Sequence, residues 1–215
     1  MNIGMLGAGN MGGALGKIWA QSGHDVLFSY SRDEQKLQKL AEEAGPHART
    51  GTPLEAAQFG DVVFVSVQPD VLADALGQAG TLAGKILITC VSGLRPDFQG
   101  FTMGVPTQRK DSVAEEIAAL VPNARVVEAF NLTFAELLKA PTREFGNERA
   151  TIPYCGDETV AKETTATLIQ DAGFEPLDIG PLIKARSLET LATTWVQFAA
   201  TTGIFPGSGI KILRQ

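Results

Sequence analysis

The chain of 215 residues is poor in several residue types that particular functions require. It has 18 Lys and Arg against 24 Asp and Glu, so it lacks the basic excess of a nucleic-acid-binding protein. Its two cysteines, Cys90 and Cys155, lie in apolar runs, which favours reduced thiols and a cytoplasmic location over a disulfide framework. The two histidines, His24 and His47, are expected in solvated turns, so no metal site is expected. No signal-peptide pattern and no membrane-spanning apolar run occurs, so neither a membrane nor a nucleic acid is an expected partner.

A glycine-rich turn near the N-terminus is the most informative motif present. The sequence Gly-Ala-Gly-Asn-Met-Gly at residues 7–12 follows an apolar run at 2–6 that is typical of a strand. A helical pattern comes next and ends near Gly23, and a second strand is expected at 25–30. This order of strand, glycine turn and helix at the start of a βαβ unit indicates a dinucleotide site.

Each glycine of this turn has an expected role. Gly7 permits the tight turn, Gly9 lets the backbone approach a pyrophosphate, and Gly12 lets the helix pack against the strand. The helix N-terminus supplies N–H groups and a partial positive charge for the phosphates.

The residues after the second strand indicate which dinucleotide binds. NAD enzymes place a carboxylate near this point, whereas Ser31 and Arg32 can bind a 2′-phosphate, with Lys36 adding charge one helical turn later. Asp33 argues for NAD, but it, like Ser31, is also a candidate N-cap of the next helix. Charge complementarity therefore favours NADP.

Strand and helix signals alternate along the rest of the chain. The fold class predicted is α/β, a Rossmann-type doubly wound parallel sheet with a compact C-terminal α/β extension that ends in an apolar helix. Residues 1–131 are expected to form the NADP-binding domain, and residues 132–215 the extension packed on it, with a possible acceptor site and dimer contact. Further strands are expected at 61–67, 85–90, 124–130, 150–155 and 174–178, and further helices at 34–44, 53–58, 69–79, 112–120, 158–171 and 181–200.

The last predicted helix is unusually apolar. Leu188, Leu191, Trp195 and Phe198 form a stripe, and no charged residue occurs from 190 to 210. We expect this stretch to be buried on most sides, either by core packing or as a dimer interface or ligand wall.

Two long loops are expected near the carboxyl ends of the strands, where open α/β sheets bind ligands. They span 92–110 and 139–149, and their length favours a functional role over a plain solvated loop.

The chain as a whole resembles the NADPH-dependent reductases of coenzyme F420 and the related predicted dinucleotide-binding NADP oxidoreductases. The residues that carry the resemblance are the glycine turn, Ser31-Arg32, Val126-Val127-Glu128-Ala129-Phe130-Asn131, Tyr154-Cys155-Gly156-Asp157, Gly173-Phe174-Glu175-Pro176, Gly180-Pro181-Leu182 and Ala185-Arg186-Ser187-Leu188-Glu189.

The resemblance implies a homodimer in which a hydride passes between NADP(H) and a deazaflavin, coenzyme F420, or a flavin-type acceptor. It implies that Gly7, Gly9, Asn10, Met11, Ser31 and Arg32 hold NADP, and that Val67, Gln68, Pro69, Ala129, Phe130 and Asn131 flank the nicotinamide. Since the cofactor carries the difficult step, no catalytic side chain is expected.

The sequence departs from this family at two positions on the expected ligand side. Val91-Ser92-Gly93-Leu94 stands where the family often has Asn-Pro, and Glu128 stands where it often has Lys. Coenzyme F420 has an acidic tail of phosphate and glutamates, so its site should be basic. The cations available for it are Arg95, Arg109, Lys110, Arg143, Arg149 and Arg186.

Three alternatives remain open from the sequence. One keeps NADP with another small acceptor, such as a carbonyl or an imine. Another is a flavin relay to ferric iron as in related membrane metalloreductases, which would need a membrane domain that this sequence does not display. The last is a non-enzymatic NADP-binding sensor, which would also lack an acid–base pair.

Overall fold

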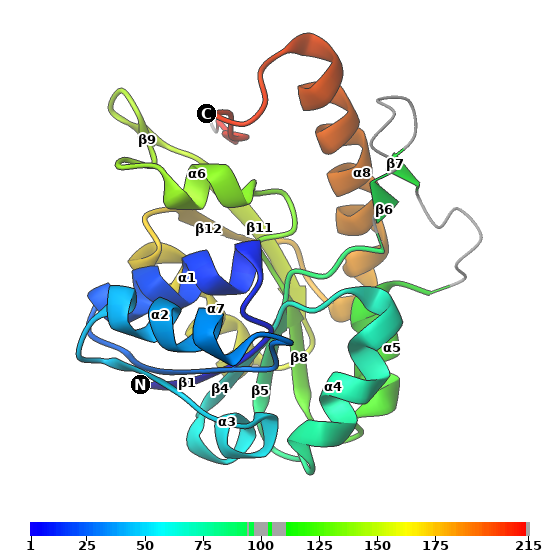
Figure 1. Ribbon diagram of the computed structural model, residues 1–215. Coiled ribbons are helices and arrows are strands. Elements are labelled where there is room, and N and C mark those ends of the chain that lie inside the picture. Colours follow the sequence, from blue (N-terminus) through cyan, green and yellow to red (C-terminus); the bar gives the residue numbers. More distant parts are fainter. Residues whose placement is uncertain (94, 97–102, 105–110, 214–215) are drawn as a thin grey trace.

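A computed structural model shows an α/β fold built on an eight-stranded sheet (Figure 1). The structure describes residues 1–93, 95–96, 103–104 and 111–213, with only the backbone at 95–96 and 103–104. The sheet strands are β1 (Asn2–Leu6), β2 (Asp25–Ser29), β3 (Ala48–Thr50), β4 (Val62–Val65), β5 (Ile86–Thr89), β8 (Arg125–Glu128), β11 (Thr151–Gly156) and β12 (Glu175–Asp178). The helices are α1 (Asn10–Gln21), α2 (Glu34–Ala44), α3 (Pro53–Phe59), α4 (Leu72–Ala79), α5 (Val113–Leu120), α6 (Ala135–Lys139), α7 (Thr159–Asp171) and α8 (Ala185–Thr202), with 3₁₀ turns η1 (Pro69–Val71) and η2 (Leu182–Lys184).

The predicted Rossmann topology is confirmed. The strand order is β12-β11-β8-β5-β4-β1-β2-β3, and the six strands from β8 to β3 are parallel. The order reverses between β1 and β4, and the glycine turn leaves β1 at that point, where open α/β sheets bind ligands.

The last two strands run against the other six, so the parallel pattern expected throughout the sheet is wrong at this edge. β11 pairs antiparallel with β8, and β12 then pairs parallel with β11. The connection explains the reversal, because α6 and the hairpin of β9 (Glu144–Phe145) and β10 (Glu148–Arg149) stay at the carboxyl end of β8. The chain therefore enters β11 from that end.

Two apolar cores lie on the two faces of the sheet. On one face, α1, α2 and α7 pack against alternate strand residues such as Met5 and Phe64. On the other face, α3, α4, α5 and part of α8 pack against residues such as Val63 and Leu87. Figure 1 shows α1, α2 and α7 on one side of the sheet and α4 and α5 on the other. The strands of the central sheet are covered on both faces, as their continuous apolar runs predict.

Local sequence signals set several helix ends. Thr52 and Ser112 each form a capping box, with Glu55 and Glu115 respectively, at the starts of α3 and α5. The helix expected over 69–79 is divided into η1 and α4, and the short elements β3 and α6 were not predicted. Three-residue and five-residue elements carry too little periodicity to be recognised from sequence.

The C-terminal part packs directly on α1. The indole Nε1 of Trp19 donates to the carbonyl oxygen of Leu168 at 2.9 Å, and His24 Nε2 lies 2.9 Å from a carboxylate oxygen of Asp171. His24 is buried, so its expected solvated position is wrong, whereas His47 is exposed. The cause is α7, which covers the turn after α1 and could not be placed there from sequence.

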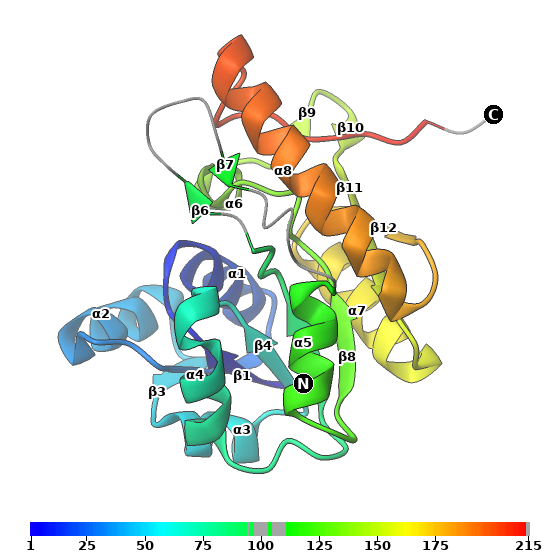
Figure 2. The same ribbon diagram turned by 90° about the vertical axis from the view of Figure 1, so that its right-hand side faces the viewer.

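The uncharged stretch from 190 to 210 is more exposed than expected. Leu188 is buried and Trp195 is partly buried, but Leu191 is 44% exposed and Phe198 is 59% exposed. The predicted stripe is therefore only partly covered by the rest of the protein. Figure 2 shows that the C-terminal half of α8 extends beyond the sheet, which leaves it fewer neighbours.

Of the two predicted loops, only the second is described in full. Most of the loop at 92–110, including Arg109 and Lys110, lies outside the described residues, which show the backbone pairing of β6 (Arg95–Pro96) with β7 (Met103–Gly104). The loop at 139–149 contains the β9–β10 hairpin. Among the described residues, no helix is long and apolar enough to cross a membrane, and no group of metal-ligating side chains is present.

Candidate cofactor site

The glycine turn joins β1 to α1, and the Gly7 N–H donates to the Ser29 carbonyl oxygen of β2 at 3.1 Å. The N-cap residue Gly9 provides no side-chain cap, and the first turn of α1 contains no acidic residue. A Cβ atom at Gly9 would meet nothing within 4 Å, so the backbone there is open to a ligand. A helix N-terminus of this kind is suited to a phosphate group.

Gly7 and Gly12 are required by the fold itself. Gly7 has φ of +108°, which L-amino acids with a side chain rarely adopt. A Cβ atom at Gly12 would collide with the carbonyl oxygen of Gly7 and with Ser66 Oγ. The roles predicted for the three glycines therefore agree with their surroundings.

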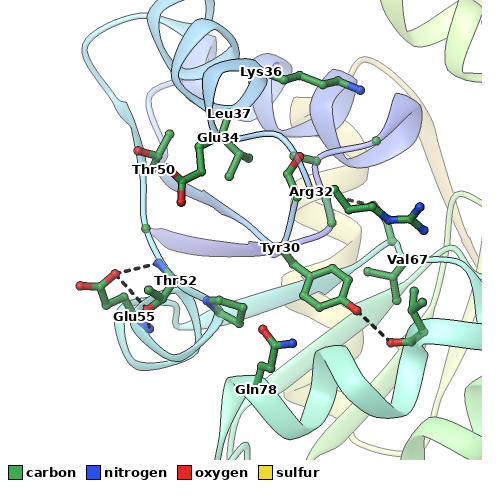
Figure 3. A pocket seen from close by; sticks show the side chains of 18 of the residues that line it. Tyr30, Arg32, Glu34, Lys36, Leu37, Thr50, Thr52, Glu55, Val67 and Gln78 are labelled. Atoms are coloured by element: carbon green, nitrogen blue, oxygen red, sulfur yellow. Dashed lines mark hydrogen bonds between the residues drawn. The ribbon is translucent and has the colours of Figure 1, made fainter.

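A cavity of about 700 Å³ follows the carboxyl ends of β1, β2, β3 and β4 (Figure 3). It brings together seven of the predicted site residues, namely Gly7, Gly9, Ser31, Arg32, Lys36, Val67 and Gln68. Asn10 lines a neighbouring cavity. Met11, Gly12, Pro69, Ala129, Phe130 and Asn131 line neither of these two cavities.

The charged residues after β2 divide into two roles. Asp33 is the N-cap of α2 and accepts a hydrogen bond from the Lys36 backbone N–H at 3.1 Å. Its carboxylate thus serves the helix and is not among the groups that line the cavity. Arg32 is exposed and reaches toward Val67 across the cavity mouth (Figure 3), while Ser31 and Lys36 line the same cavity. This end of the cavity is suited to a phosphate monoester.

Tyr30 is a wall residue that the sequence did not reveal. It adopts φ of +57°, and its hydroxyl donates to Asp74 Oδ2 at 2.7 Å, which fixes the ring between β2 and α4. Burial, followed by the hydrogen bond to Asp74, raises the pKa of Tyr30 to about 12. The phenol therefore stays neutral and presents an apolar ring to the cavity.

Further lining residues were also missed by sequence reasoning. They are Thr50 at the end of β3, Gly51 and Thr52 just after it, and Gln78 on α4, which donates to the same Asp74 oxygen as Tyr30. Figure 3 shows Thr52 bonded to Glu55 in the capping box. Since β3 is only three residues long, no periodic signal marked its end as part of the site.

The residues expected beside the nicotinamide at the end of β8 are buried. Ala129 and Phe130 have no exposed surface, and Phe130 packs edge-on against Trp19 at 5.9 Å between ring centroids. Asn131 is 8% exposed, and neither atom of its amide has a hydrogen-bond partner. Of these three residues, Asn131 is the one whose polar atoms are left for a ligand.

Glu128, one residue before this segment, is a buried carboxyl group without a hydrogen-bond partner. It is 0% exposed, and both side-chain oxygens are unpaired. Burial, with a smaller contribution from Glu189, raises the pKa of Glu128 well above its ordinary value. Glu189 itself accepts from the Val113 backbone N–H at 2.6 Å. The position that departs from the family resemblance is thus a buried carboxyl group whose surroundings favour its protonated form.

The comparisons with known proteins agree with this geometry. Residues 2–93 match the family model described as NADP oxidoreductase, coenzyme F420-dependent. A structure of a candidate F420-dependent NADP reductase from Arthrobacter sp. FB24 covers the whole of both chains with 27% identity and a TM-score of 0.86. An NADPH complex of a reductive aminase from Aspergillus terreus, at 21% identity and a TM-score of 0.65, shows a similar fold.

A curated relative comes from a different class of reductase. Metalloreductase STEAP3 of Rattus norvegicus is 33% identical over 189 residues, which is 88% of this chain and 36% of the relative. This chain thus spans about a third of the length of that protein. These three proteins are named for different activities, namely F420-dependent NADP reduction, reductive amination and metal reduction. Residues 2–93 of this chain, which include the glycine turn and the Ser31-Arg32 pair, are similar to the coenzyme F420-dependent NADP oxidoreductases that this family model describes.

Proposed function

We propose that the protein is an oxidoreductase that transfers a hydride between NADP(H) and a deazaflavin, coenzyme F420, or a flavin-type acceptor. The observation that carries the proposal is the cavity end formed by Ser31, Arg32 and Lys36, with Asp33 engaged in capping α2. The family of residues 2–93 supports the cofactor, and the resemblance along the whole chain supports the acceptor.

The protein's part in this reaction is to bind and align. The first turn of α1 would hold the pyrophosphate, and Arg32 and Lys36 the 2′-phosphate. Val67 and Gln68 line the way from the glycine turn toward β5 and β8. When bound, NADPH supplies the hydride, so the chain contributes proximity and exclusion of water.

Turnover with defined acceptors tests the proposal. NADPH oxidation is followed by nicotinamide absorbance with coenzyme F420, FMN, FAD and no acceptor, and the series is repeated with NADH. Turnover with coenzyme F420 that favours NADPH supports the proposal. Tight NADPH binding without turnover on any of these acceptors contradicts it and points to a sensor.

We also propose that the protein is a homodimer that uses the exposed face of α8. Leu191 and Phe198 on α8, with Ile204 and Phe205 just after it, place apolar surface together on a helix that extends beyond the sheet. Such a patch is more typical of an interface than of solvent-exposed surface. Light scattering coupled to size-exclusion chromatography tests this assembly.

A further inference from the structure

A second cavity adjoins the cofactor cavity and is strongly basic. It has a volume of about 650 Å³ and lies between α1, α2 and α6. We call it the basic cavity, defined by its charged lining residues Lys17, Lys36, Lys39, Glu43, Lys139 and Arg143. Five cations thus face one carboxylate, in a chain whose net charge is −6.

The internal contacts of the basic cavity do not neutralise it. Glu43 accepts from Lys17 Nζ at 2.8 Å, while Lys139 donates to the neutral amide oxygen of Asn10 at 3.1 Å. Within the described part of the chain, Lys36 and Lys39 have no ion-pair partner at 4 Å or less, although they lie one turn apart on α2. The hydrogen bond from Lys17 and, to a smaller extent, the charge of Lys39 lower the pKa of Glu43, four residues after Lys39 on α2. Lys17 and Lys39 therefore share this one carboxylate, and the basic cavity keeps an excess of positive charge.

Two of the other candidate cations for an acidic tail are already paired. Arg186 lies 2.7 Å from both Asp111 and Glu115, and Arg149 lies 3.6 Å from Glu144. Of the candidate cations whose side chains the structure describes, Arg143 is the one that lines the basic cavity. Its Nε donates to the Ala172 carbonyl oxygen at 2.9 Å, which leaves the rest of the guanidinium for a ligand.

The basic cavity is continuous with the cofactor site and with the acceptor side. Ala8, Gly9 and Lys36 line both cavities. The wall formed by α6 follows directly after Asn131 and the end of β8, where the acceptor ring would meet the nicotinamide. A flexible tail attached to that ring would thus find the basic cavity beside it.

We propose that the basic cavity binds the anionic tail, phosphate and carboxylates, of the hydride acceptor. The inference rests on the proposed function and specifies which end of the acceptor provides affinity. The 2′-phosphate of NADP is assigned to the end lined by Ser31 and Arg32, and Lys36 lies where the two cavities meet. The tail is therefore predicted to respond to substitutions at Lys17 and Lys39, and the 2′-phosphate to substitution at Arg32.

The test compares two deazaflavins that share a ring and differ in the tail. Steady-state KM is measured for coenzyme F420 and for the tail-less deazaflavin that ends at its ribityl group. In Lys17→Ala/Lys39→Ala, the KM for coenzyme F420 should rise about tenfold, while the KM values for the tail-less compound and for NADPH stay within about twofold. Lys184→Ala is the matched control, because Lys184 is an exposed lysine outside both cavities.

A variant of opposite sign sharpens the test. Glu43→Gln removes the one carboxylate of the basic cavity and frees Lys17, so the KM for coenzyme F420 should fall about threefold. Raising the salt concentration should reduce both effects. Thermal melts check that each variant folds.

Three results would overturn the inference. Equal changes for the tailed and tail-less compounds would show that the basic cavity does not contact the tail. A rise in the KM for NADPH without one for coenzyme F420 would assign the cavity to the nucleotide. If neither deazaflavin is reduced while NADPH binds, the proposed function fails and this inference fails with it.

Discussion

Replacing Glu128 by glutamine should stabilise the protein increasingly as the pH rises. Glu128 is fully buried without a hydrogen-bond partner, and burial raises its pKa well above the ordinary value. The native state therefore keeps this proton at a pH at which the unfolded chain has released it. Stability of the unmodified protein falls over that range by about 1.4 kcal/mol per pH unit from this group.

The sign and the range of this effect can be worked out. Below the unfolded pKa of about 4.3, both states hold the proton and the group contributes no pH dependence. Above that pKa, the free energy of unfolding of the unmodified protein falls progressively until the pH reaches the folded pKa of Glu128. Glutamine does not titrate, so between these two pKa values Glu128→Gln should gain stability over the unmodified protein at up to about 1.4 kcal/mol per pH unit.

Urea unfolding at several pH values measures this difference. Other titrating groups are common to both proteins and cancel in the comparison. Glu163→Gln, on the exposed face of α7, is the matched control for loss of a carboxylate. Stability curves for Glu128→Gln and the unmodified protein that run parallel with pH would refute a neutral Glu128. A variant that becomes relatively less stable as the pH rises would refute it more strongly.

Further predictions address the cofactor site and the assembly. Arg32→Ala should weaken NADPH binding by about 1.5–3 kcal/mol with a much smaller effect on NADH, and equal losses in a fluorescence titration would reject the 2′-phosphate contact. Gly12→Ala should lower the melting temperature, because its Cβ would collide with the Gly7 carbonyl oxygen. Gly9→Ala should keep the melting temperature of the unmodified protein and bind NADPH less tightly. The opposite pair of results would contradict the roles of the two glycines. Phe198→Glu should convert a dimer to a monomer in light scattering with a stability change of about 0.5 kcal/mol or less, and an unchanged mass would remove α8 from the interface.

Much of the cofactor half could be predicted because its signals are local. Gly7 and Gly12 meet backbone constraints that few other residues satisfy, and the apolar runs of β1 and β4 are buried on both faces. Ser31 and Arg32 follow shortly after the end of β2, so the topology places them at the carboxyl edge of the sheet. The residues of this one βαβ unit are therefore enough to predict most of the nucleotide site.

The rest of the site depends on contacts between distant segments, which a single sequence does not display. Tyr30 becomes a wall residue through Asp74, and Lys139 reaches Asn10 across 129 positions of the chain. The burial of Glu128 depends on α8, and the exposure of Phe198 depends on how far α8 extends past the sheet. Periodicity predicts that these helices exist, but it does not predict which of their faces another element covers.

The division between the two halves has a physical reason. NADP can be held by backbone N–H groups and a few side chains within the first strands and helices, and the family match covers that part, residues 2–93. Glu128, Lys139 and Arg143 all follow residue 93 and lie on β8, on α6 or just after α6. The basic cavity joins the two halves, because Lys17 and Lys39 come from α1 and α2 whereas Lys139 and Arg143 come from the later segment. A substitution at Arg143 should therefore change the charge of the basic cavity without altering the glycine turn.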